Sequence, residues 1–335
     1  MRRYKIDLRS NNRIHYLLLE YNMRIFLTGA SGFIGTQLVR QLSAKTDCTL
    51  KACVRKKIEL PEGVRAYQVN DIGKEHHWSA ILSDIDVVIH LAGYTHLPPG
   101  LTCEKELFRI NTEGSIHLAR QAAESGVKRF IFISSIKIHG NESGSHPFMV
   151  SDIPKPVGPY AQSKWQTEQA LLTMLNQYDM ETVIIRPPLV YGYGAAGNFG
   201  QLVHWLKAGI PLPLGSVHNR RSLVALDNLV DLLITCIDHP AAANQTFLVS
   251  DGEDLSTTEL LRRLGQAMGK PTHLLPIPVP LLQWGAALLG KKAVAQKLLG
   301  SLQVDITATC NTLGWQPPIS VDEGLQRCFP KQKKT

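Results

Sequence analysis

Two residues able to move a proton lie four positions apart in this sequence. Tyr160-Ala-Gln-Ser-Lys164 is expected to open a helix, which places the phenol and the ammonium group on one face. A free tyrosine, with a pKa of about 10, is a poor acid–base at neutral pH, and a neighbouring cation lowers such a pKa by about 1–3 units. This spacing alone is common in structural helices. Ser135 favours a catalytic interpretation of this spacing, because it follows an apolar strand expected at residues 130–134 and could hydrogen-bond a substrate carbonyl.

A second pattern is a run of three glycines, Gly29, Gly32 and Gly35, between an apolar strand at 24–28 and a helix through 36–43. A strand before the glycines and a helix after them is the context that a dinucleotide-binding turn requires. The first glycine permits the tight turn, the second lets a pyrophosphate approach the backbone, and the third allows close packing of helix on strand. The free N–H groups of the helix would then face the phosphates.

The end of the second expected strand, residues 50–54, bears on the choice of cofactor. An NAD site usually has Asp or Glu there to bind the ribose 2′-hydroxyl, whereas this chain continues Arg55-Lys56-Lys57. A guanidinium group suits a 2′-phosphate, so the sequence favours NADP, with NAD as the alternative. The other interpretation is that Arg55 is a surface cation on a loop.

Short apolar strands alternating with helices must position these residues. Continuous β-type runs at 87–90, 130–134 and 182–186 are typical of strands buried on both faces, and a further strand is expected at 245–249. Helices are expected at 110–125 and 163–177. This rhythm predicts an α/β fold with a Rossmann-type doubly wound parallel sheet. After Arg186 the chain becomes rich in glycine and proline, which predicts a smaller, partly interleaved C-terminal substrate-binding lobe.

The expected division of the 335 residues has three parts. Residues 1–22 form an N-terminal extension whose place in the native protein is open. Residues 23–186 form the dinucleotide-binding domain, to which 223–250 return. Residues 187–222 and 251–330 form the substrate-binding lobe.

Composition narrows the function classes. The net charge of +8 is concentrated at both ends of the chain and no basic patch is interleaved with aromatic residues, so nucleic-acid binding is not expected. No Cys/His cluster with metal-ligand spacing occurs, so no metal site is predicted. Prolines interrupt the uncharged stretch 271–290, leaving a helix of about ten residues, which is too short to span a bilayer. We expect a cytoplasmic protein.

Together these motifs resemble the extended short-chain dehydrogenase/reductase superfamily, that is, the NAD-dependent epimerase/dehydratase family, over residues 23–329. The chain is similar to UDP-sugar 4-epimerases and to bacterial nucleotide-sugar 4-keto reductases. The resemblance implies that Ser135, Tyr160 and Lys164 are catalytic, and that Ser135, Asn198 and Arg221 contact a nucleotide-sugar substrate. For Asn198 and Arg221, a helix cap and a surface cation remain as alternatives. A homodimer is compatible with the resemblance. The implied cofactor contacts are Gly29, Ser31, Gly32, Phe33, Ile34, Gly35, Arg55, Asp71, Ile72, Leu91, Ala92, Gly93, Asn111, Tyr160, Lys164 and Pro187.

Departures from the family pattern decide between activities. Ile136 and Lys137 occupy the places where dehydratases carry Asp-Glu, so sugar 4,6-dehydration is not expected. Leu189 stands where 4-epimerases usually carry Asn, and His139 replaces a common tyrosine. The expected function is therefore NADPH-dependent reduction of a nucleotide-linked 4-keto sugar in surface polysaccharide biosynthesis. The resemblance suggests UDP-2-acetamido-2,6-dideoxy-hexos-4-ulose as substrate and UDP-N-acetylquinovosamine, or a related sugar, as product. The alternative is a UDP-sugar 4-epimerase with tightly bound NAD, and a third, less favoured reading is a non-catalytic NADP sensor.

Overall fold

A computed structural model describes residues 22–73, 76–95, 104–174 and 177–330, together with the backbone of two short strands near the N-terminus. These strands, β1 (Tyr4–Ile6) and β2 (Tyr16–Leu18), pair antiparallel. The rest of the expected extension 1–22, except Asn22, lies outside the described residues.

Seven parallel strands form the main sheet, in the order β11-β8-β7-β6-β3-β4-β5. The strands are β3 (Met23–Thr28), β4 (Cys48–Val54), β5 (Arg65–Gln68), β6 (Val87–His90), β7 (Arg129–Ile133), β8 (Glu181–Arg186) and β11 (Thr246–Leu248). The order reverses between β3 and β6, and such a switch point is where ligands bind at the carboxyl edge of an open α/β sheet. Only β5 was not expected, because it is an edge strand with exposed side chains and lacks the apolar run.

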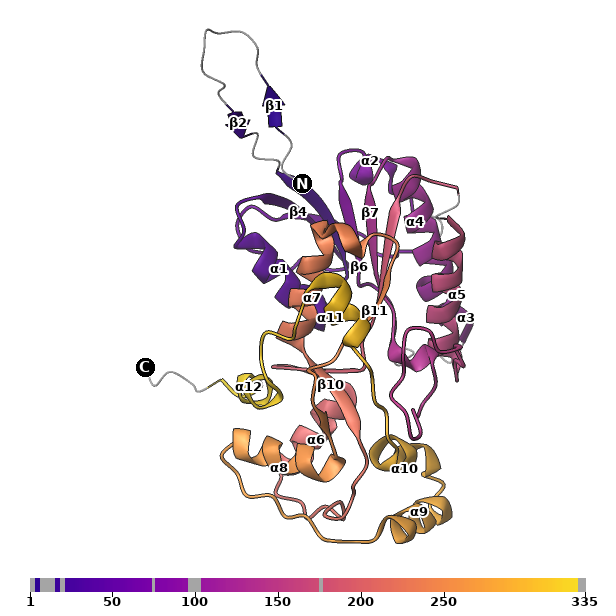
Figure 1. The fold of residues 1–335 in the computed structure, drawn as a ribbon, viewed down its shortest axis with the longest axis vertical. Coiled ribbons are helices and arrows are strands. Elements are labelled where there is room, and N and C mark those ends of the chain that lie inside the picture. The colour runs from indigo at the N-terminus through magenta and orange to yellow at the C-terminus, as the bar shows by residue number, and fades with distance from the viewer. Residues whose placement is uncertain are drawn as a thin grey trace.

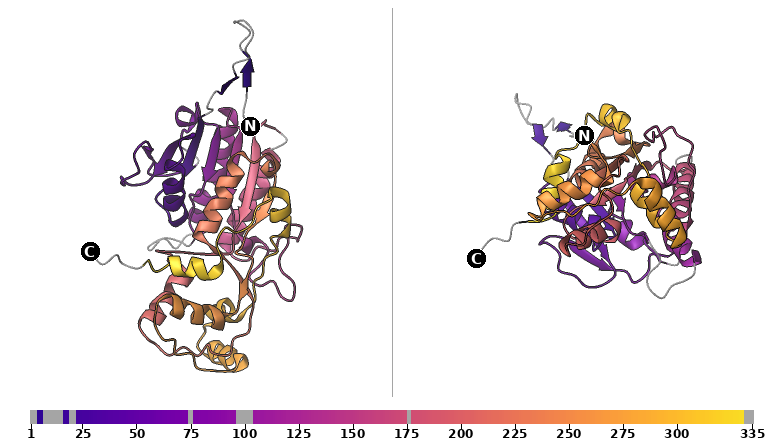
Figure 2. Two further views of the ribbon diagram at one scale, coloured as in Figure 1. Left: turned by 60° about the vertical axis from the view of Figure 1, so that its left-hand side comes forward. Right: turned by 90° about the horizontal axis from the view of Figure 1, so that it is seen from below.

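Helices cover both faces of this sheet, as Figures 1 and 2 show, which confirms the doubly wound prediction. One face carries α1 (Phe33–Ser43), α7 (Leu226–Asp238) and α11 (Thr307–Leu313). The other carries α2 (Ser79–Leu82), α3 (Glu104–Phe108), α4 (Ser115–Glu124) and α5 (Pro159–Met174). Between α3 and α4 the chain widens into a π-helical turn, η1 (Arg109–Gly114).

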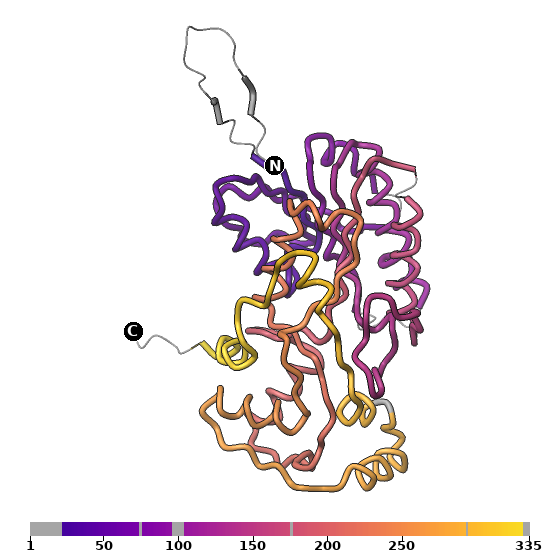
Figure 3. The backbone as a smooth tube through the Cα atoms, viewed as in Figure 1, coloured from indigo at the N-terminus to yellow at the C-terminus, as the bar shows by residue number. Residues whose placement is uncertain are grey.

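A second, smaller part lies below the sheet in Figure 1, and the chain passes between the two parts several times (Figure 3). It contains a three-stranded sheet of β9 (Leu189–Tyr191), β10 (Arg221–Ala225) and β12 (Asp254–Leu255). Its helices are α6 (Gly197–Lys207), α8 (Thr257–Ala267), α9 (Val279–Leu288), α10 (Lys292–Leu299) and α12 (Val321–Arg327). The short helix expected in the stretch 271–290 is α9, which begins among the prolines with Pro280 in its first turn. Nowhere in the described ranges is a helix both long and apolar enough to cross a membrane. The proposed domain boundaries stay a prediction.

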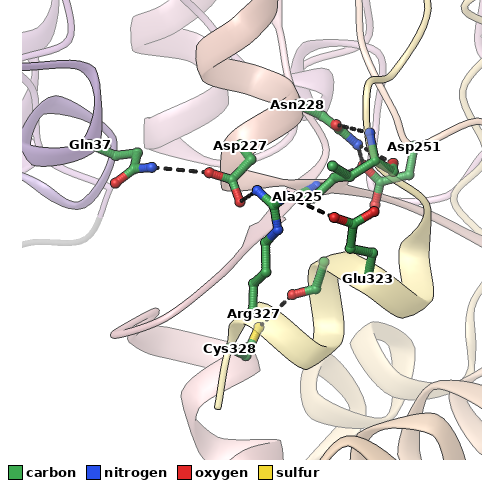
Figure 4. A network of polar contacts seen from close by, with 10 residues as sticks. Gln37, Ala225, Asp227, Asn228, Asp251, Glu323, Arg327 and Cys328 are labelled. Atoms are coloured by element: carbon green, nitrogen blue, oxygen red, sulfur yellow. Dashed lines mark hydrogen bonds and ion pairs between the residues drawn. The ribbon is translucent and has the colours of Figure 1, made fainter. Parts of the chain in front are cut away.

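A polar network ties the two parts together (Figure 4). Asp227 accepts hydrogen bonds from Gln37 of α1 and from Arg327 of α12, both at 3.0 Å. The buried carboxylate of Asp251 accepts one from the backbone N–H of Ala225 at 2.8 Å. Because the network joins α1, α7, β10 and α12, it holds the second part against the carboxyl edge of the main sheet.

Candidate active site

The glycine turn follows β3 and leads into α1. Gly29 has φ +73°, and a Cβ added there would lie 2.8 Å from the backbone N of Ala92. A Cβ on Gly35 would lie 2.1 Å from the carbonyl oxygen of Gly29, so both positions require glycine. The N-cap of α1 is Gly32, and no side chain caps the helix, which leaves N–H groups available for an anion. The turn therefore fits the pyrophosphate of a dinucleotide.

At the other end of the expected cofactor site, Arg55 directly follows β4, and its guanidinium carbon lies 5.9 Å from the centre of the Tyr94 ring. The Asp71 carboxylate accepts hydrogen bonds from Arg109 at 2.6 Å and from the backbone N–H of Gly73 at 2.7 Å. The hydrogen bond from Arg109 is the main cause that lowers the pKa of Asp71. The neighbouring Ile72 is buried.

Asn111 fixes the segment after β6, which holds the predicted residues Leu91, Ala92 and Gly93. Its side chain accepts a hydrogen bond from the backbone N–H of Tyr94 at 2.7 Å and donates one to the Tyr94 carbonyl at 2.8 Å. The backbone carbonyl of Asn111 accepts hydrogen bonds from two hydroxyl groups, that of Ser115 in α4 at 2.7 Å and that of Thr167 in α5 at 2.9 Å. Asn111 is therefore a positioning residue here, and its contact with a cofactor stays a prediction.

The three predicted catalytic residues converge at the carboxyl ends of β6 and β7. The Ser135 side chain lies close enough to the Tyr160 phenol to lower its pKa, and Lys164 lies one helical turn further along α5. The Lys164 ammonium donates to the carbonyl of Ile133 at 2.8 Å and lies 4.6 Å from the centre of the Phe132 ring.

Burial shifts both titratable groups of this trio away from the charged form. It lowers the pKa of Lys164 to about 8. It also raises the pKa of Tyr160, and the neighbouring Ser135 side chain only partly offsets this effect. The prediction that Lys164 lowers the pKa of Tyr160 is therefore wrong for this structure, because burial raises that pKa and Lys164 is not among the groups that shift it.

A buried ion pair joins β8 to α5, the helix that carries Tyr160 and Lys164. This pair was not predicted from the sequence. Arg186, at the end of β8, donates to Glu168 of α5 at 3.1 and 2.6 Å, and neither side chain is more than 6% exposed. The same guanidinium contacts Nε2 of His139 at 2.9 Å. Since Arg can only donate, this histidine nitrogen must accept, and burial together with Arg186 lowers the pKa of His139 to about 4. The sequence offered one sign of a buried acid here, since Glu168 lies four residues after Lys164 on the same helix face.

One cation lies beside the Tyr160 ring, and the charges of two more from separate elements act on it. Lys137, in the short helix η2 (Ile136–Ile138), has its ammonium 5.9 Å from the centre of the Tyr160 ring. Burial lowers the pKa of Lys137, and the charges of Lys297 and Arg221 lower it further. Arg221 is partly buried and donates to the carbonyl of Gly300 at 2.9 Å, so it is no simple surface cation.

Two other predicted positions behave differently. Asn198 is exposed and is the second residue of α6, whose N-cap is Ala196, so it is not a helix cap. The carbonyl of Pro187 accepts the backbone N–H of Ile136 at 3.0 Å, which places Pro187 beside the catalytic strand end. Their ligand contacts stay predictions.

Comparison with known proteins gives the chain a family. The model of the "NAD dependent epimerase/dehydratase family" matches residues 25–250. The chain belongs to this family. A UDP-glucose 4-epimerase of Vibrio cholerae is 45% identical over 307 residues, covering 90% of this chain and 93% of the relative. An N-acetyl-alpha-D-glucosaminyl-diphospho-ditrans,octacis-undecaprenol 4-epimerase of Escherichia coli O157:H7 is 26% identical, with 91% and 94% covered.

Solved structures of the family share the fold. The UDP-glucose 4-epimerase of Thermotoga maritima, with UDP-glucose, superposes with a TM-score of 0.75 at 24% identity, covering 91% of this chain and 97% of that one. The UDP-glucuronic acid 4-epimerase of Bacillus cereus, in complex with NAD, also gives 0.75, at 20% identity and the same coverage. The family member described here is thus an enzyme with the family's Rossmann-like sheet.

Proposed function

We propose that this enzyme is a UDP-sugar 4-epimerase that uses NAD. The observation that supports this most is the 45% identity, over 90% of the chain, to the UDP-glucose 4-epimerase of Vibrio cholerae. Tyr160, with Ser135 beside it and Lys164 one turn away, supplies the acid–base group that such a reaction needs. The keto reductase that we expected from sequence motifs has weaker support than this alternative.

Tyr160 is the proton carrier in this proposal. When bound, NAD would supply the hydride chemistry, accepting a hydride from carbon 4 of the sugar and giving it back to the opposite face. Tyr160 takes the proton of the 4-hydroxyl group and later returns it, while the neighbouring Ser135 side chain favours its phenolate form. Because burial raises the pKa of Tyr160, its phenolate needs a cation nearby, and Lys164 is held at that place by the Ile133 carbonyl.

The cations beside Tyr160 favour an anionic substrate. Lys137, Arg221 and Lys297 approach closely enough for the last two to lower the pKa of the first. A diphosphate or another anionic group placed among them would relieve this repulsion. We therefore infer that a nucleotide diphosphate sugar occupies the space between η2, β10 and α10.

A second candidate function is the NADPH-dependent reduction of a nucleotide-linked 4-keto sugar. One observation favours it, since Arg55 and not a carboxylate follows β4. In a reductase the hydride leaves the cofactor for good, so each product molecule consumes one NADPH. In an epimerase the hydride returns, and the cofactor is not consumed.

Stoichiometry separates the two candidates. The purified enzyme is incubated with UDP-glucose or UDP-N-acetylglucosamine, and separately with a UDP-2-acetamido-2,6-dideoxy-4-keto sugar and NADPH. Nucleotide sugars are separated by chromatography while absorbance at the reduced-nicotinamide band is recorded. We expect interconversion of the 4-epimers without net loss of reduced cofactor. Loss of NADPH equal to the keto sugar reduced, without epimerisation of either UDP-sugar, would establish the reductase instead.

A further inference from the structure

Helix α9 exposes large apolar side chains at the end of the molecule farthest from β1 and β2 (Figure 1). Leu281, Trp284 and Leu288 are spaced so that they share one helix face, and they are 59%, 67% and 68% exposed. Leu289, which follows α9, is 73% exposed, and Val294 of α10 is 48% exposed. Isolated apolar residues on a surface are ordinary, but a contiguous group of this kind marks an interaction surface.

The opposite side of α9 packs on the protein, which fixes how the exposed side is presented. Leu282, on that side, packs with Leu212 and Leu298 in the core of the second part. Between α9, α10 and residues 210–214 lies an apolar hollow of about 530 Å³. Leu281, Leu289 and Val294 line this hollow, and every residue of α9 except Gln283 is apolar although none is fully buried. Such a helix normally lies in a core or in contact with lipid.

The charges around this face have one sign. No Asp or Glu occurs between Glu181 and Asp227 or between Glu259 and Asp305, and these two stretches supply α6, the 210–214 loop, α9 and α10. Lys291 and Lys292 lie exposed at the junction of α9 and α10. The apolar face is thus bordered by cations without an acidic residue from the elements that build it.

We propose that the face formed by Leu281, Trp284, Leu288, Leu289 and Val294 docks on the surface of an anionic lipid bilayer. An apolar stripe with an interfacial tryptophan and flanking lysines is the chemistry of a helix that lies in the headgroup region. With ten residues, α9 is too short to span the hydrocarbon core and would lie along the surface.

Charge distinguishes a bilayer from a second copy of the chain as the occupant. In a two-fold dimer the same patch meets itself, so the interface would gather Lys291 and Lys292 of both copies and no acidic residue from these elements. Anionic headgroups offer the opposite charge to the same lysines. Docking would also hold Arg221 near the bilayer, since α10 leads directly into Gly300, whose carbonyl accepts its guanidinium group.

Vesicle flotation tests this proposal with the full-length protein. Vesicles contain phosphatidylcholine alone or phosphatidylcholine mixed with phosphatidylglycerol. We expect at least tenfold more protein to float with the anionic vesicles than without vesicles. Trp284→Ser/Leu288→Ser should abolish flotation, and Lys291→Glu/Lys292→Glu should remove the preference for anionic lipid. Leu172→Ser, which alters an exposed leucine of α5 in the other part of the molecule, serves as the matched control and should float like the parent protein.

Folding of each variant is checked by its circular dichroism and its melting temperature. Equal recovery of the parent protein with and without vesicles would overturn the proposal, as would an equal loss in Leu172→Ser. Sedimentation velocity tests the other candidate for this face, a second copy of the chain. A parent dimer that Trp284→Ser/Leu288→Ser converts to monomer, without any vesicle binding, would assign this face to a second copy of the chain. The outcome does not depend on whether the enzyme is an epimerase or a reductase.

Discussion

At Tyr160 burial and charge act in opposite directions. Burial raises the pKa of the phenol, while the neighbouring Ser135 side chain favours the phenolate. We predict that Tyr160→Phe folds and binds cofactor like the parent protein but loses turnover by about 10²–10⁴-fold, the usual contribution of a positioned acid–base group. Initial rates and cofactor titrations measure this, with Tyr178→Phe, which lies beyond the C-terminal end of α5, as control. Near-parental turnover in Tyr160→Phe would show that another group moves the proton.

Arg55 tests cofactor choice, also at the scale of one residue. Its guanidinium group lies at the end of β4, where the 2′-position of a bound ribose is expected. We predict that Arg55→Ala weakens NADP binding about tenfold, the loss of one charge-assisted contact, and changes NAD binding little. Fluorescence titration of both cofactors measures the ratio, and Lys57→Ala, which removes a neighbouring exposed cation, is the control. An unchanged ratio in Arg55→Ala would make Arg55 an ordinary surface cation.

The element that depends most on backbone approach is the junction of β3 with α1. A Cβ on Gly35 would lie 2.1 Å from the Gly29 carbonyl oxygen and 2.8 Å from the Cα of Ala30, and backbone cannot move aside cheaply. We predict that Gly35→Ala lowers the melting temperature and abolishes dinucleotide binding. Gly285→Ala in α9, where no atom lies within 4 Å of the added Cβ, should be neutral or stabilise by up to ~1 kcal/mol. Thermal unfolding with and without NAD compares the two, and a Gly35→Ala variant that binds NAD normally would contradict the assigned turn.

At the scale of the whole molecule, two buried histidines make the free energy of unfolding depend on pH in the acid range. Burial lowers the pKa of His90 to about 3, and burial with Arg186 lowers that of His139 to about 4. A histidine with a lower pKa in the folded state binds more protons when unfolded, so its contribution is complete above about pH 6.5 and is lost as the pH falls. The loss continues down to about pH 4 for His139 and about pH 3 for His90.

We predict that His139→Gln, which keeps an acceptor for Arg186 but does not titrate, flattens this dependence by up to ~1.4 kcal/mol per pH unit below pH 6.5. Urea unfolding at pH 7.5, 6.5 and 5.5 measures the slope. His204→Gln, at an exposed position of α6, should keep the parental slope. A parental slope in His139→Gln would place the acid sensitivity elsewhere.

The sequence by itself determined what depends on local pattern. Apolar runs placed six of the seven main strands, because strands buried on both faces need continuous hydrophobicity. Glycine spacing located the turn at 29–35, and the four-residue spacing of Tyr160 and Lys164 put both on α5. The same local reading ranked reductase above epimerase, an order that the relatives reverse.

Only the tertiary structure decided which distant residues meet. Arg186, Glu168 and His139 come from β8, α5 and the end of η2, and no local period connects them. In the sequence, Lys137 was notable only because it stands where dehydratases carry an acidic residue. The tertiary structure brings it within the influence of the charges of Arg221 and Lys297, which lower its pKa. From the sequence alone, the apolar residues of α9 were as compatible with a buried helix as with an exposed one. Its exposure was decided by packing, since burial depends on which surfaces the rest of the chain leaves uncovered.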